Sequence, residues 1–370
     1  MLGVKPQTLY AYVSRHKIRA SADPQDPRRS LYTRQDIEVL MRKMRRPRAR
    51  AEVAEEAIHW GDPVLATAIS EVREGTIWLR GHRIQDCAAY MTLEEVTAHL
   101  CGLEEIVCPA TALNVTGQSS FTRAMKALAS QTDSAASMLG RDLSNIAIDA
   151  ERVMSIIANA CLGDAKDGQI HARIGAVWGI ETQSQDIIRR ALVLLSDHEL
   201  NPSTFAVRVS ASTGTSLPAA LLAGMATLSG PRHGGVAGLA KAALDVTMKG
   251  YLDDFLKENA RQDPYTYGFG HPLYPDGDPR ATELLEQIPF DSPERSAVEI
   301  LSERLLLPPN IDAALAASAV HFNWPPDAAT VLFSIGRASG WIAHAIEQIT
   351  GGEMIRPRAK YQSVSSMELP

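Results

Sequence analysis

The sequence predicts a mainly α-helical protein preceded by a separate basic unit, on three observations. Apolar residues recur at helical spacing through most of residues 92–348, whereas β-rich runs are confined to one region near residue 75. A chain of 370 residues with 45% apolar composition has enough material for one large core or two moderate ones. Residues 1–50 hold thirteen Lys or Arg against four Asp or Glu, a net charge of +9. Since the whole chain has a net charge of −6, the remaining residues carry −15.

The basic unit, residues 1–50, contains two expected helices. The first lies in LGVKPQTLYAYVSRHKIRA, where apolar residues share one face after Pro6. The second lies in LYTRQDIEVLMRKM, with Thr33 as its cap. This pattern resembles the winged helix-turn-helix of the MerR type, with RRSLYTRQDI as wing and following helix. Such domains begin with a helix before LGV, whereas this chain begins at Met1, so we expect that the module is incomplete or that its true start lies upstream.

A charged linker, residues 45–58, separates the basic unit from the folded body. The body opens with a short hairpin, predicted from two β-rich runs around the turn Glu74-Gly75. Two segments, LPAALLAGMATL and AALAASAV, are apolar on nearly every face and are expected to be buried inside an α-protein. Helices are predicted over residues 92–101, 120–131, 150–161, 182–195, 216–228, 235–257, 294–305, 311–321 and 327–348.

Several functional classes are excluded by what the sequence lacks. The four cysteines are far apart and form no C-x-x-C pair, so they are expected to be buried thiols in a reducing, cytoplasmic compartment. No apolar run reaches the roughly 18–20 residues of a membrane-spanning helix, so no membrane partner is expected. The phosphate loop, the G-x-S-x-G nucleophile elbow and the H-E-x-x-H metal helix are all missing. These absences weigh against metal and nucleotide-hydrolysis mechanisms.

Three of the ten histidines stand out by their surroundings. A lone histidine in an apolar setting is usually a core residue. His198, His233 and His271 instead lie among glycines, prolines and charges, in LLSDHELNPST, SGPRHGGVAG and YGFGHPLYPDGDPRA. Glycines beside a histidine allow a ligand and the backbone to approach closely. These three segments are therefore the candidates for a functional site.

At these residues the sequence resembles the citrate synthase family, over about residues 60–362. Seven blocks occur in the family's order: TAISEVREGTIWLRGHRIQDCA, SDHELNPST, GPRHGGVAG, GFGHPLYPDGDPRA, PNIDAAL, GRASGWIAHAIEQ and IRPRAKY. The resemblance implies a citrate-synthase-like helical fold over residues 51–370. Its large domain would comprise about 52–233 and 323–370, and its small domain, about 234–322, would close over the substrates.

The resemblance also implies roles for individual residues. His233 matches the histidine that donates a hydrogen bond to the thioester carbonyl of acetyl-CoA, and Asp312 matches the carboxylate that removes the methyl proton. His271 matches the histidine that polarises the carbonyl of oxaloacetate. The groups that match the family's carboxylate-binding residues are His198, Arg280, Arg337 and Arg356. Arg356 is expected to reach in from the other subunit of a homodimer, so that the active sites are shared.

General chemistry supports these roles. The α-proton of a thioester is only weakly acidic, so a carboxylate base needs a preorganised donor at the enolate oxygen, and a neutral imidazole is suitable. Oxaloacetate is a dianion, and guanidinium groups pair with carboxylates through two hydrogen bonds. Because the body carries a net −15, Arg280, Arg337 and Arg356 must cluster locally to bind such a substrate.

Structural explanations of the same residues remain open at this point. Asp312 is also explained as a first-turn acid favoured by the helix dipole. Arg280 is also explained by a surface ion pair with Asp276 or Asp278, worth about 0–1 kcal/mol. The basic tail around Arg356 is also explained as a solvated charged run.

Three departures from the family's pattern keep the substrate pair open. Pro272 follows His271 where an arginine is common, and Ala313 follows Asp312 where an aromatic residue is usual. The path between the two blocks is also short for the family.

The resemblance predicts condensation of acetyl-CoA with oxaloacetate and water to give citrate and CoA, with no metal or bound cofactor. One alternative is 2-methylcitrate synthesis from propionyl-CoA. A second is a DNA-binding regulator with a citrate-synthase-derived sensing domain, supported by the +9 segment and opposed by its missing first helix. A third possibility is that the basic unit serves in oligomerisation or docking.

Overall fold

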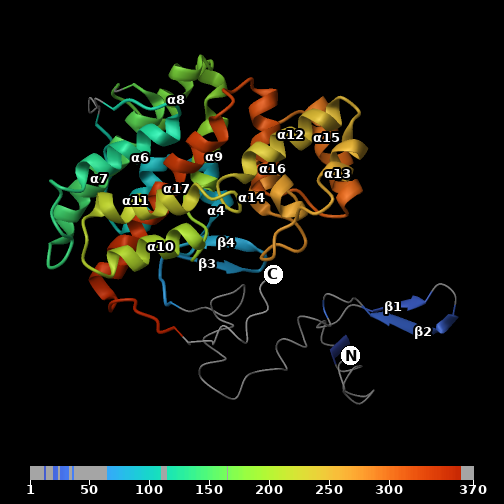
Figure 1. Ribbon diagram of the computed structural model, residues 1–370, viewed down its shortest axis with the longest axis horizontal. Helices are drawn as coiled ribbons and strands as arrows, with labels where there is room; N and C mark the ends of the chain where they lie inside the picture. Colours follow the sequence, from blue (N-terminus) through green and yellow to red (C-terminus); the bar gives the residue numbers. More distant parts are fainter. Residues whose placement is uncertain are drawn as a thin grey trace, which may run out of the picture. The chain divides into compact units, whose positions relative to one another are not determined.

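The computed structural model contains two compact units, Met1–Ala66 and Thr67–Pro370, and Figure 1 shows the chain. It describes residues 65–109, 115–164 and 166–359, together with residues 12–13, 20–23, 26–32 and 36 of the first unit.

The described part of the first unit contains an antiparallel hairpin of β1 (Ala20–Asp23) and β2 (Asp26–Tyr32), with Ala20 opposite Tyr32. The two helices expected on either side of this hairpin lie essentially outside the described residues. The MerR-like helix-turn-helix therefore stays a prediction.

The second unit begins with a small antiparallel sheet of β3 (Ser70–Arg73), β4 (Thr76–Leu79) and β5 (His82–Arg83). Its first turn confirms the predicted hairpin, because Arg73 pairs with Thr76 across Glu74 and Gly75. Both turn residues have positive φ, 54° and 73°, as two-residue hairpin turns require. The two-residue strand β5 was not predicted.

Helices make up most of the second unit, as the sequence predicts. In its described part they are α4 (Ile84–Tyr90), α5 (Leu93–Cys101), α6 (Ser120–Gln131), α7 (Leu143–Leu162), α8 (Ile170–Trp178), η1 (Thr182–Ser184), α9 (Asp186–Leu194), α10 (Pro202–Ala211), α11 (Leu217–Leu228), α12 (Val236–Met248), α13 (Leu252–Glu258), η2 (Pro264–Tyr267), α14 (Pro279–Leu285), α15 (Pro293–Leu305), α16 (Ile311–His321) and α17 (Ala328–Gly351).

Each of the nine predicted helical segments contains a helix, with three differences in extent. The segment 150–161 begins earlier, at Leu143. The segment 182–195 divides into η1 and α9. The segment 235–257 divides into α12 and α13, because the chain turns at Gly250, which has a φ of 80°. The helices α4, α8, α10 and α14 were not predicted.

Helix α17 forms the centre of the second unit (Figure 1). It contacts α5, α7, α9, α10 and α11, and its Trp341 is completely buried. Helices α12 to α16 lie together on one side of the unit. The division into a large and a small domain stays a prediction.

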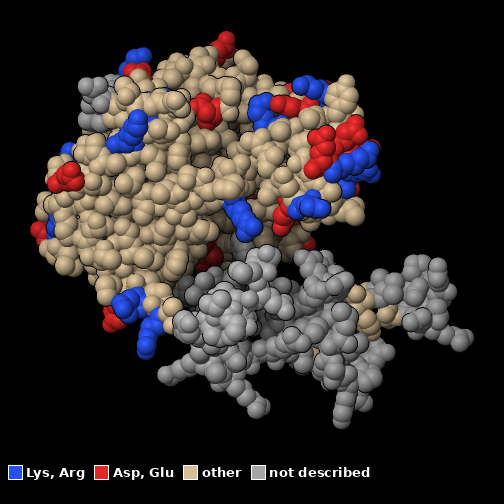
Figure 2. All heavy atoms as spheres, in the orientation of Figure 1, with Lys and Arg blue, Asp and Glu red and all other residues tan. Residues whose placement is uncertain are grey.

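The two all-apolar helices differ in their burial. Helix α16 is buried from Ile311 to Ala319, as expected. Helix α11 is buried on one side only, since Leu222 and Ala223 are partly exposed and Ala226 is exposed. Figure 2 shows almost no charged side chains over α10 and α11. The prediction of complete burial was therefore wrong for α11, whose outer side forms an apolar surface.

The four cysteines are buried free thiols, as predicted. None of the helices in the described ranges is long and apolar enough to cross a membrane.

Candidate active site

The loop before His271 pairs with the residues before Asp312. The backbone N–H of Gly270 donates to the carbonyl of Pro308 at 2.7 Å, and an antiparallel β-bridge links the adjacent residues Phe269 and Pro309. This pairing fixes His271 relative to the first turn of α16, which carries Asp312. Two residues about forty positions apart are thus held together by backbone contacts.

Gly268 makes this close approach possible. Its carbonyl accepts a hydrogen bond from the N–H of Asn310 at 2.8 Å. Its φ is 87°, and a Cβ added there would lie 2.6 Å from the backbone nitrogen of Ala313. Only glycine tolerates both the left-handed conformation and this contact. The glycine-rich block is therefore required by the packing of the loop on α16.

Asp312 is a buried carboxyl group with an unusually high pKa. Its side chain is 5% exposed, and its Oδ1 has no hydrogen-bond partner among the described residues. Burial raises the pKa of Asp312 to about 7, although the charges of Arg280 and Arg337 act in the opposite direction. A carboxyl group with this pKa exchanges its proton near neutral pH, as a general base must.

His271 is held as a neutral imidazole. Its Nδ1 accepts a hydrogen bond from the backbone N–H of Leu273 at 3.1 Å. Burial, followed by the charge of Arg280, lowers the pKa of His271 to about 4. With Nδ1 as an acceptor, the proton of the neutral ring lies on Nε2. His271 is therefore a neutral hydrogen-bond donor through Nε2.

The rings of His271, His198 and Tyr274 pack together. The centroid of the His271 ring lies 5.0 Å from that of His198 and 4.9 Å from that of Tyr274. Nε2 of His198 forms a hydrogen bond of 2.9 Å with the hydroxyl of Tyr274. Burial, with the charge of Arg280, lowers the pKa of His198 well below its usual value. Both histidines are therefore neutral and held in fixed orientations.

Arg280 is buried in an ion pair with Asp278. Its Nε and Nη2 donate to the two carboxylate oxygens of Asp278 at 2.9 and 2.7 Å, and the side chain is 3% exposed. Asp278 also caps α14 and accepts the backbone N–H of Ile311 at 3.1 Å. The alternative of a pair at the surface was therefore wrong, although the partner Asp278 was named correctly.

Arg337 enters the site from α17. Its Nε donates to the carbonyl of Leu195 at 2.8 Å, and the residue is 2% exposed. Burial lowers the pKa of Arg337 to about 10, against the opposing effect of Asp197. The guanidinium therefore stays charged at neutral pH.

His233 lies in the turn between α11 and α12. Its Nε2 forms a hydrogen bond of 2.8 Å with Oγ of Ser203, which also accepts Nε1–H of Trp341 at 3.2 Å. Burial, followed by the charge of Arg337, lowers the pKa of His233 to about 4. His233 is thus also neutral at physiological pH.

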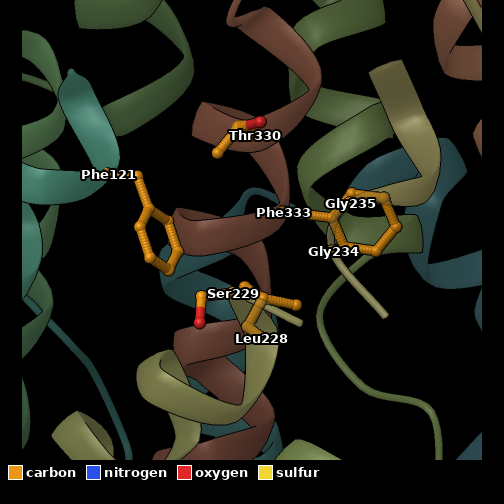
Figure 3. Close-up of a pocket in the computed structure, with 7 residues that line it drawn as sticks. All are labelled: Phe121, Leu228, Ser229, Gly234, Gly235, Thr330 and Phe333. Atoms are coloured by element: carbon orange, nitrogen blue, oxygen red, sulfur yellow. The ribbon is translucent and has the colours of Figure 1, made fainter. Parts of the chain in front are cut away.

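A mainly apolar cavity of about 200 Å³ lies beside the His233 turn (Figure 3). Two glycines of its lining directly follow His233, and two phenylalanines come from α6 and α17. The lining residues are Phe121, Leu228, Ser229, Gly234, Gly235, Thr330 and Phe333.

The single chain brings six of the seven predicted site residues into one electrostatically linked group. Arg280 acts on the pKa values of His198, His271 and Asp312, and Arg337 acts on that of His233. We call these six residues the buried cluster: His198, His233, His271, Arg280, Asp312 and Arg337.

Arg356 is the seventh predicted residue, and it is exposed in the segment after α17. The N–H of the preceding residue, Ile355, donates to Oγ of Ser212 at 3.1 Å, which anchors the segment on the end of α10. No described contact joins Arg356 to the buried cluster within one chain.

Sequence reasoning missed two tyrosines of the site. Tyr274 contacts both His198 and His271, and the ring centroid of Tyr265 lies 5.7 Å from that of His271. Burial, with the charge of Asp312, raises the pKa of Tyr265 to about 12. Tyr274 stands inside the block that contains His271, so its position in that block was the available signal.

Comparison with known proteins shows the family. The family model described as citrate synthase, C-terminal domain, matches residues 109–358, which is more than half of the chain. The chain therefore belongs to the citrate synthase family.

Two relatives and one solved structure illustrate the similarity. The chain is 32% identical over 187 residues to citrate synthase 2 of Bacillus subtilis (48% of this chain, 50% of that protein). It is 29% identical over 205 residues to 2-methylcitrate synthase 1 of Corynebacterium glutamicum (52% and 54%). The chain thus spans about half the length of the curated relatives it matches. The citrate synthase of Thermoplasma acidophilum, in a ternary complex with carboxymethyl coenzyme A and oxaloacetate, has the same fold. Its TM-score is 0.67 at 20% identity, over 82% of this chain and 97% of that one.

Proposed function

We propose that the protein condenses acetyl-CoA with oxaloacetate and water to give citrate and CoA. The observation that carries this proposal is Asp312, a buried carboxyl group with a pKa near neutrality and an unpartnered oxygen among the described residues. It lies within the electrostatic reach of two buried arginines. A base, neutral donors and cations in one buried site are what this condensation needs.

In the first step, the carboxylate of Asp312 removes a proton from the methyl group of acetyl-CoA. The electron pair moves onto the thioester oxygen and forms an enolate. His233 stabilises that oxygen by a hydrogen bond, and since Ser203 occupies its Nε2, we assign Nδ1–H to the substrate. This assignment requires Nε2 to accept from the hydroxyl of Ser203, which has to turn away from Oδ1 of Asn201, its acceptor at 2.7 Å. The cavity beside the His233 turn supplies an apolar environment for the acyl group.

In the second step, the enolate carbon attacks the ketone carbon of oxaloacetate and forms the new carbon–carbon bond. Nε2–H of His271 polarises the ketone and gives its proton to the oxygen as this becomes a hydroxyl. In the hydrolysis step water returns a proton to His271, and the proton held by Asp312 leaves with the departing thiolate of CoA. His198, Arg280 and Arg337 bind the carboxylates. Water then cleaves the citryl thioester and releases CoA with a free thiol, and this chemistry uses neither a metal nor a bound cofactor. Closure of the small domain would exclude bulk water before the enolate forms.

The test is release of free thiol from acetyl-CoA in the presence of oxaloacetate, followed with a thiol-reactive dye. Reactions lacking either substrate serve as controls for thioester hydrolysis. No release with oxaloacetate and any short acyl-CoA would refute the proposed function.

Propionyl-CoA is the alternative acyl donor, because one of the matched relatives is named a 2-methylcitrate synthase. One methylene group in an apolar pocket is worth only about 1–3 kcal/mol of discrimination. The ratio of kcat/KM for acetyl-CoA and propionyl-CoA decides between the two reactions.

We also propose a homodimer with shared active sites. The apolar outer side of α11 and the partly exposed Phe121 and Met125 of α6 provide a surface for a second copy. Mixing His271→Ala protein with Arg356→Ala protein tests the shared site. If Arg356 acts in the partner's site, half of the sites in each mixed dimer are intact, and random mixing restores about a quarter of the activity. Absence of any recovery, with mixed dimers demonstrated, would place Arg356 outside the partner's site.

A role in DNA binding has one supporting feature, the +9 balance of residues 1–50, which include Tyr10, Arg15 and Lys17 on the predicted recognition helix. Binding to mixed-sequence duplex DNA that weakens steeply with salt would support this role, and no binding at low salt would remove it. Light scattering of the full chain and of a chain beginning near residue 52 tests oligomerisation through the same segment.

A further inference from the structure

One side of α17 holds the chain segment that leads into His198. Three residues of the helix contact three consecutive residues of that segment, and they stand at positions i, i+3 and i+7, which share one helical face. The contacts are Arg337 Nε to the carbonyl of Leu195 at 2.8 Å, Gly340 N to the carbonyl of Ser196 at 2.9 Å, and His344 Nε2 to Oδ1 of Asp197 at 3.4 Å.

Gly340 allows this segment to lie directly on the helix. A Cβ at this position would collide with the carboxylate of Asp197 and lie 2.6 Å from the carbonyl oxygen of Ser196. The contact is therefore one of backbone against backbone, which leaves little freedom for the segment to shift along α17.

Asp197 is a fully buried carboxylate with several partners. Oγ of Ser70 donates to its Oδ2, the backbone N–H of Glu199 donates to the same oxygen at 3.2 Å, and His344 pairs with Oδ1. Burial alone would raise the pKa of Asp197, but His344, Arg337 and Ser70 together outweigh it and lower the pKa below its usual value. The group is therefore a buried negative charge.

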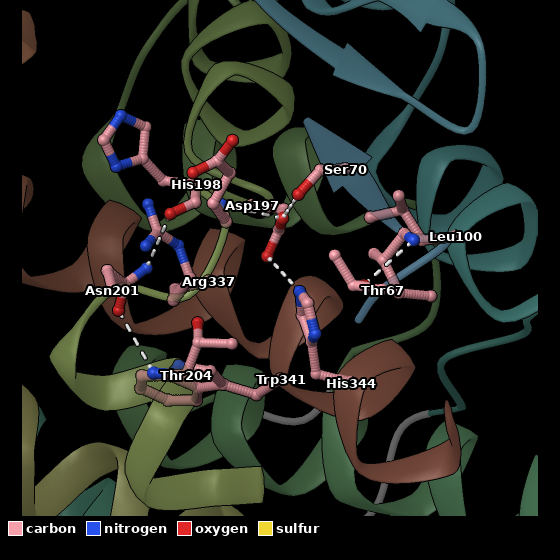
Figure 4. A network of polar contacts seen from close by, with 12 residues as sticks. Thr67, Ser70, Leu100, Asp197, His198, Asn201, Thr204, Arg337, Trp341 and His344 are labelled. Carbon is pink, nitrogen blue, oxygen red and sulfur yellow. Dashed lines mark hydrogen bonds and ion pairs between the residues drawn. The ribbon is translucent and has the colours of Figure 1, made fainter. Parts of the chain in front are cut away.

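His198 and Asp197 point to opposite sides of the segment (Figure 4). His198 faces Tyr274 and His271, whereas Asp197 faces His344 and Ser70. The next residue, Glu199, has a φ of 48°, so the chain turns sharply immediately after the histidine. The orientation of His198 thus depends on how the adjacent Asp197 is anchored.

We propose that Asp197 and His344 form a positioning pair for the binding of the keto acid. The pair does not touch the substrate. It holds the segment that carries His198, and its carboxylate supports the positive charge of Arg337. His344 is completely buried, and the approach of its Nε2 to Oδ1 of Asp197 at 3.4 Å, which lies outside hydrogen-bond geometry, is the polar contact that the described residues give it. Removing His344 leaves Oδ1 of the buried Asp197 without its nearest polar neighbour, while Ser70 and the N–H of Glu199 stay on Oδ2, so the segment is expected to move. This inference rests on the proposed function.

The test compares three variants of α17 in the full-length protein. His344→Leu removes the partner of Asp197, whereas His344→Gln retains an N–H donor at a similar distance from the backbone. Ile342→Ala is the matched control: Ile342 is also completely buried, and its side chain leaves the helix on nearly the opposite side from that of His344, about 160° away. Melting temperature, kcat and the KM values for oxaloacetate and acetyl-CoA are measured for each.

The expected result is a rise in the KM for oxaloacetate of about ten- to a hundredfold in His344→Leu, since small misplacements of binding groups have effects of this size. The KM for acetyl-CoA should change by less than about twofold, and His344→Gln should recover most of the loss. Ile342→Ala should lower the melting temperature without this selective effect. Should His344→Leu fail to fold, Ser70→Ala, which removes the hydroxyl bound to Asp197, is expected to raise the same KM by a smaller factor.

The outcomes separate the two proposals. A wild-type protein that releases no thiol overturns the proposed function and, with it, the positioning role. An active wild type whose His344→Leu and Ile342→Ala variants change both KM values equally overturns the positioning role alone. The positioning role is also overturned if the substitute variant Ser70→Ala leaves the KM for oxaloacetate unchanged.

Discussion

Replacing Asp312 by Asn tests the proposed base, because the change keeps the shape of the side chain and removes its ability to accept the methyl proton. Loss of a general base typically lowers turnover by about 10² to 10⁴. Oxaloacetate binding should persist, since it is assigned to other residues of the buried cluster. Thiol release gives kcat, and calorimetry gives the affinity for oxaloacetate.

The same substitution should stabilise the fold in a pH-dependent way. The pKa of Asp312 rises from 3.8 in the unfolded chain to about 7 in the folded protein. The folded state therefore holds a proton that the unfolded state has released, and wild-type stability falls as pH rises between these two values. A shift of about three units at 1.36 kcal/mol each gives a cost of about 4 kcal/mol at pH 8. The amide introduced by Asp312→Asn does not ionise, so the stability advantage of this variant over wild type should grow from pH 4 to pH 8.

Activity of the wild type should follow the ionisation of the same group. With a pKa near 7, roughly one Asp312 in eleven is ionised at pH 6 and about ten in eleven at pH 8. His233 and His271, with pKa values of about 4, stay neutral over this range. We therefore expect kcat/KM to rise about tenfold through a single transition.

An Asp312→Asn variant that keeps more than a tenth of the wild-type turnover would refute the role of Asp312 as base.

Three further outcomes are expected. Gly268→Ala should lower both melting temperature and kcat, because its Cβ would lie 2.6 Å from the nitrogen of Ala313; an unchanged melting curve would contradict that packing. Tyr274→Phe removes the hydroxyl that binds Nε2 of His198 and should raise the KM for oxaloacetate by about two- to tenfold while the KM for acetyl-CoA stays constant. His271→Gln should lose less stability than wild type between pH 6.5 and 4, because the lowered pKa of His271 makes its protonation favour the unfolded chain; parallel melting-temperature profiles would exclude this effect.

The sequence predicted the long helices better than the short ones, for a physical reason. Extended periodic patterns such as that of α17 are unambiguous, whereas α10 and α14 are short and begin with Pro202 and Pro279. Proline is well tolerated in the first helical turn, so these residues mark helix starts as readily as loops. Both helices have side-chain caps, from Asn201 and Asp278, within the blocks that predicted the site.

The histidines and Asp312 were found because their blocks have distinctive glycines and prolines, but the partners of these residues depend on folding. The pairing of Asp197 with His344 joins residues 147 positions apart, and no local pattern indicates it. Burial likewise decides the pKa of Asp312, and burial follows from packing that the sequence pattern does not specify.

The charges of the folded site change the expectation about substrate attraction. From the sequence, clustered arginines had to overcome the −15 charge of the body. In the structure, Arg280 is paired with Asp278, and Arg337 lies within the field of Asp197, so each arginine has a buried acid nearby. The histidines of the buried cluster are neutral. A single chain therefore presents the dianionic substrate with hydrogen-bond donors but with little net positive charge. A further cation from outside this cluster would supply that positive charge, which is the electrostatic reason for the proposal that the partner subunit's Arg356 completes the site.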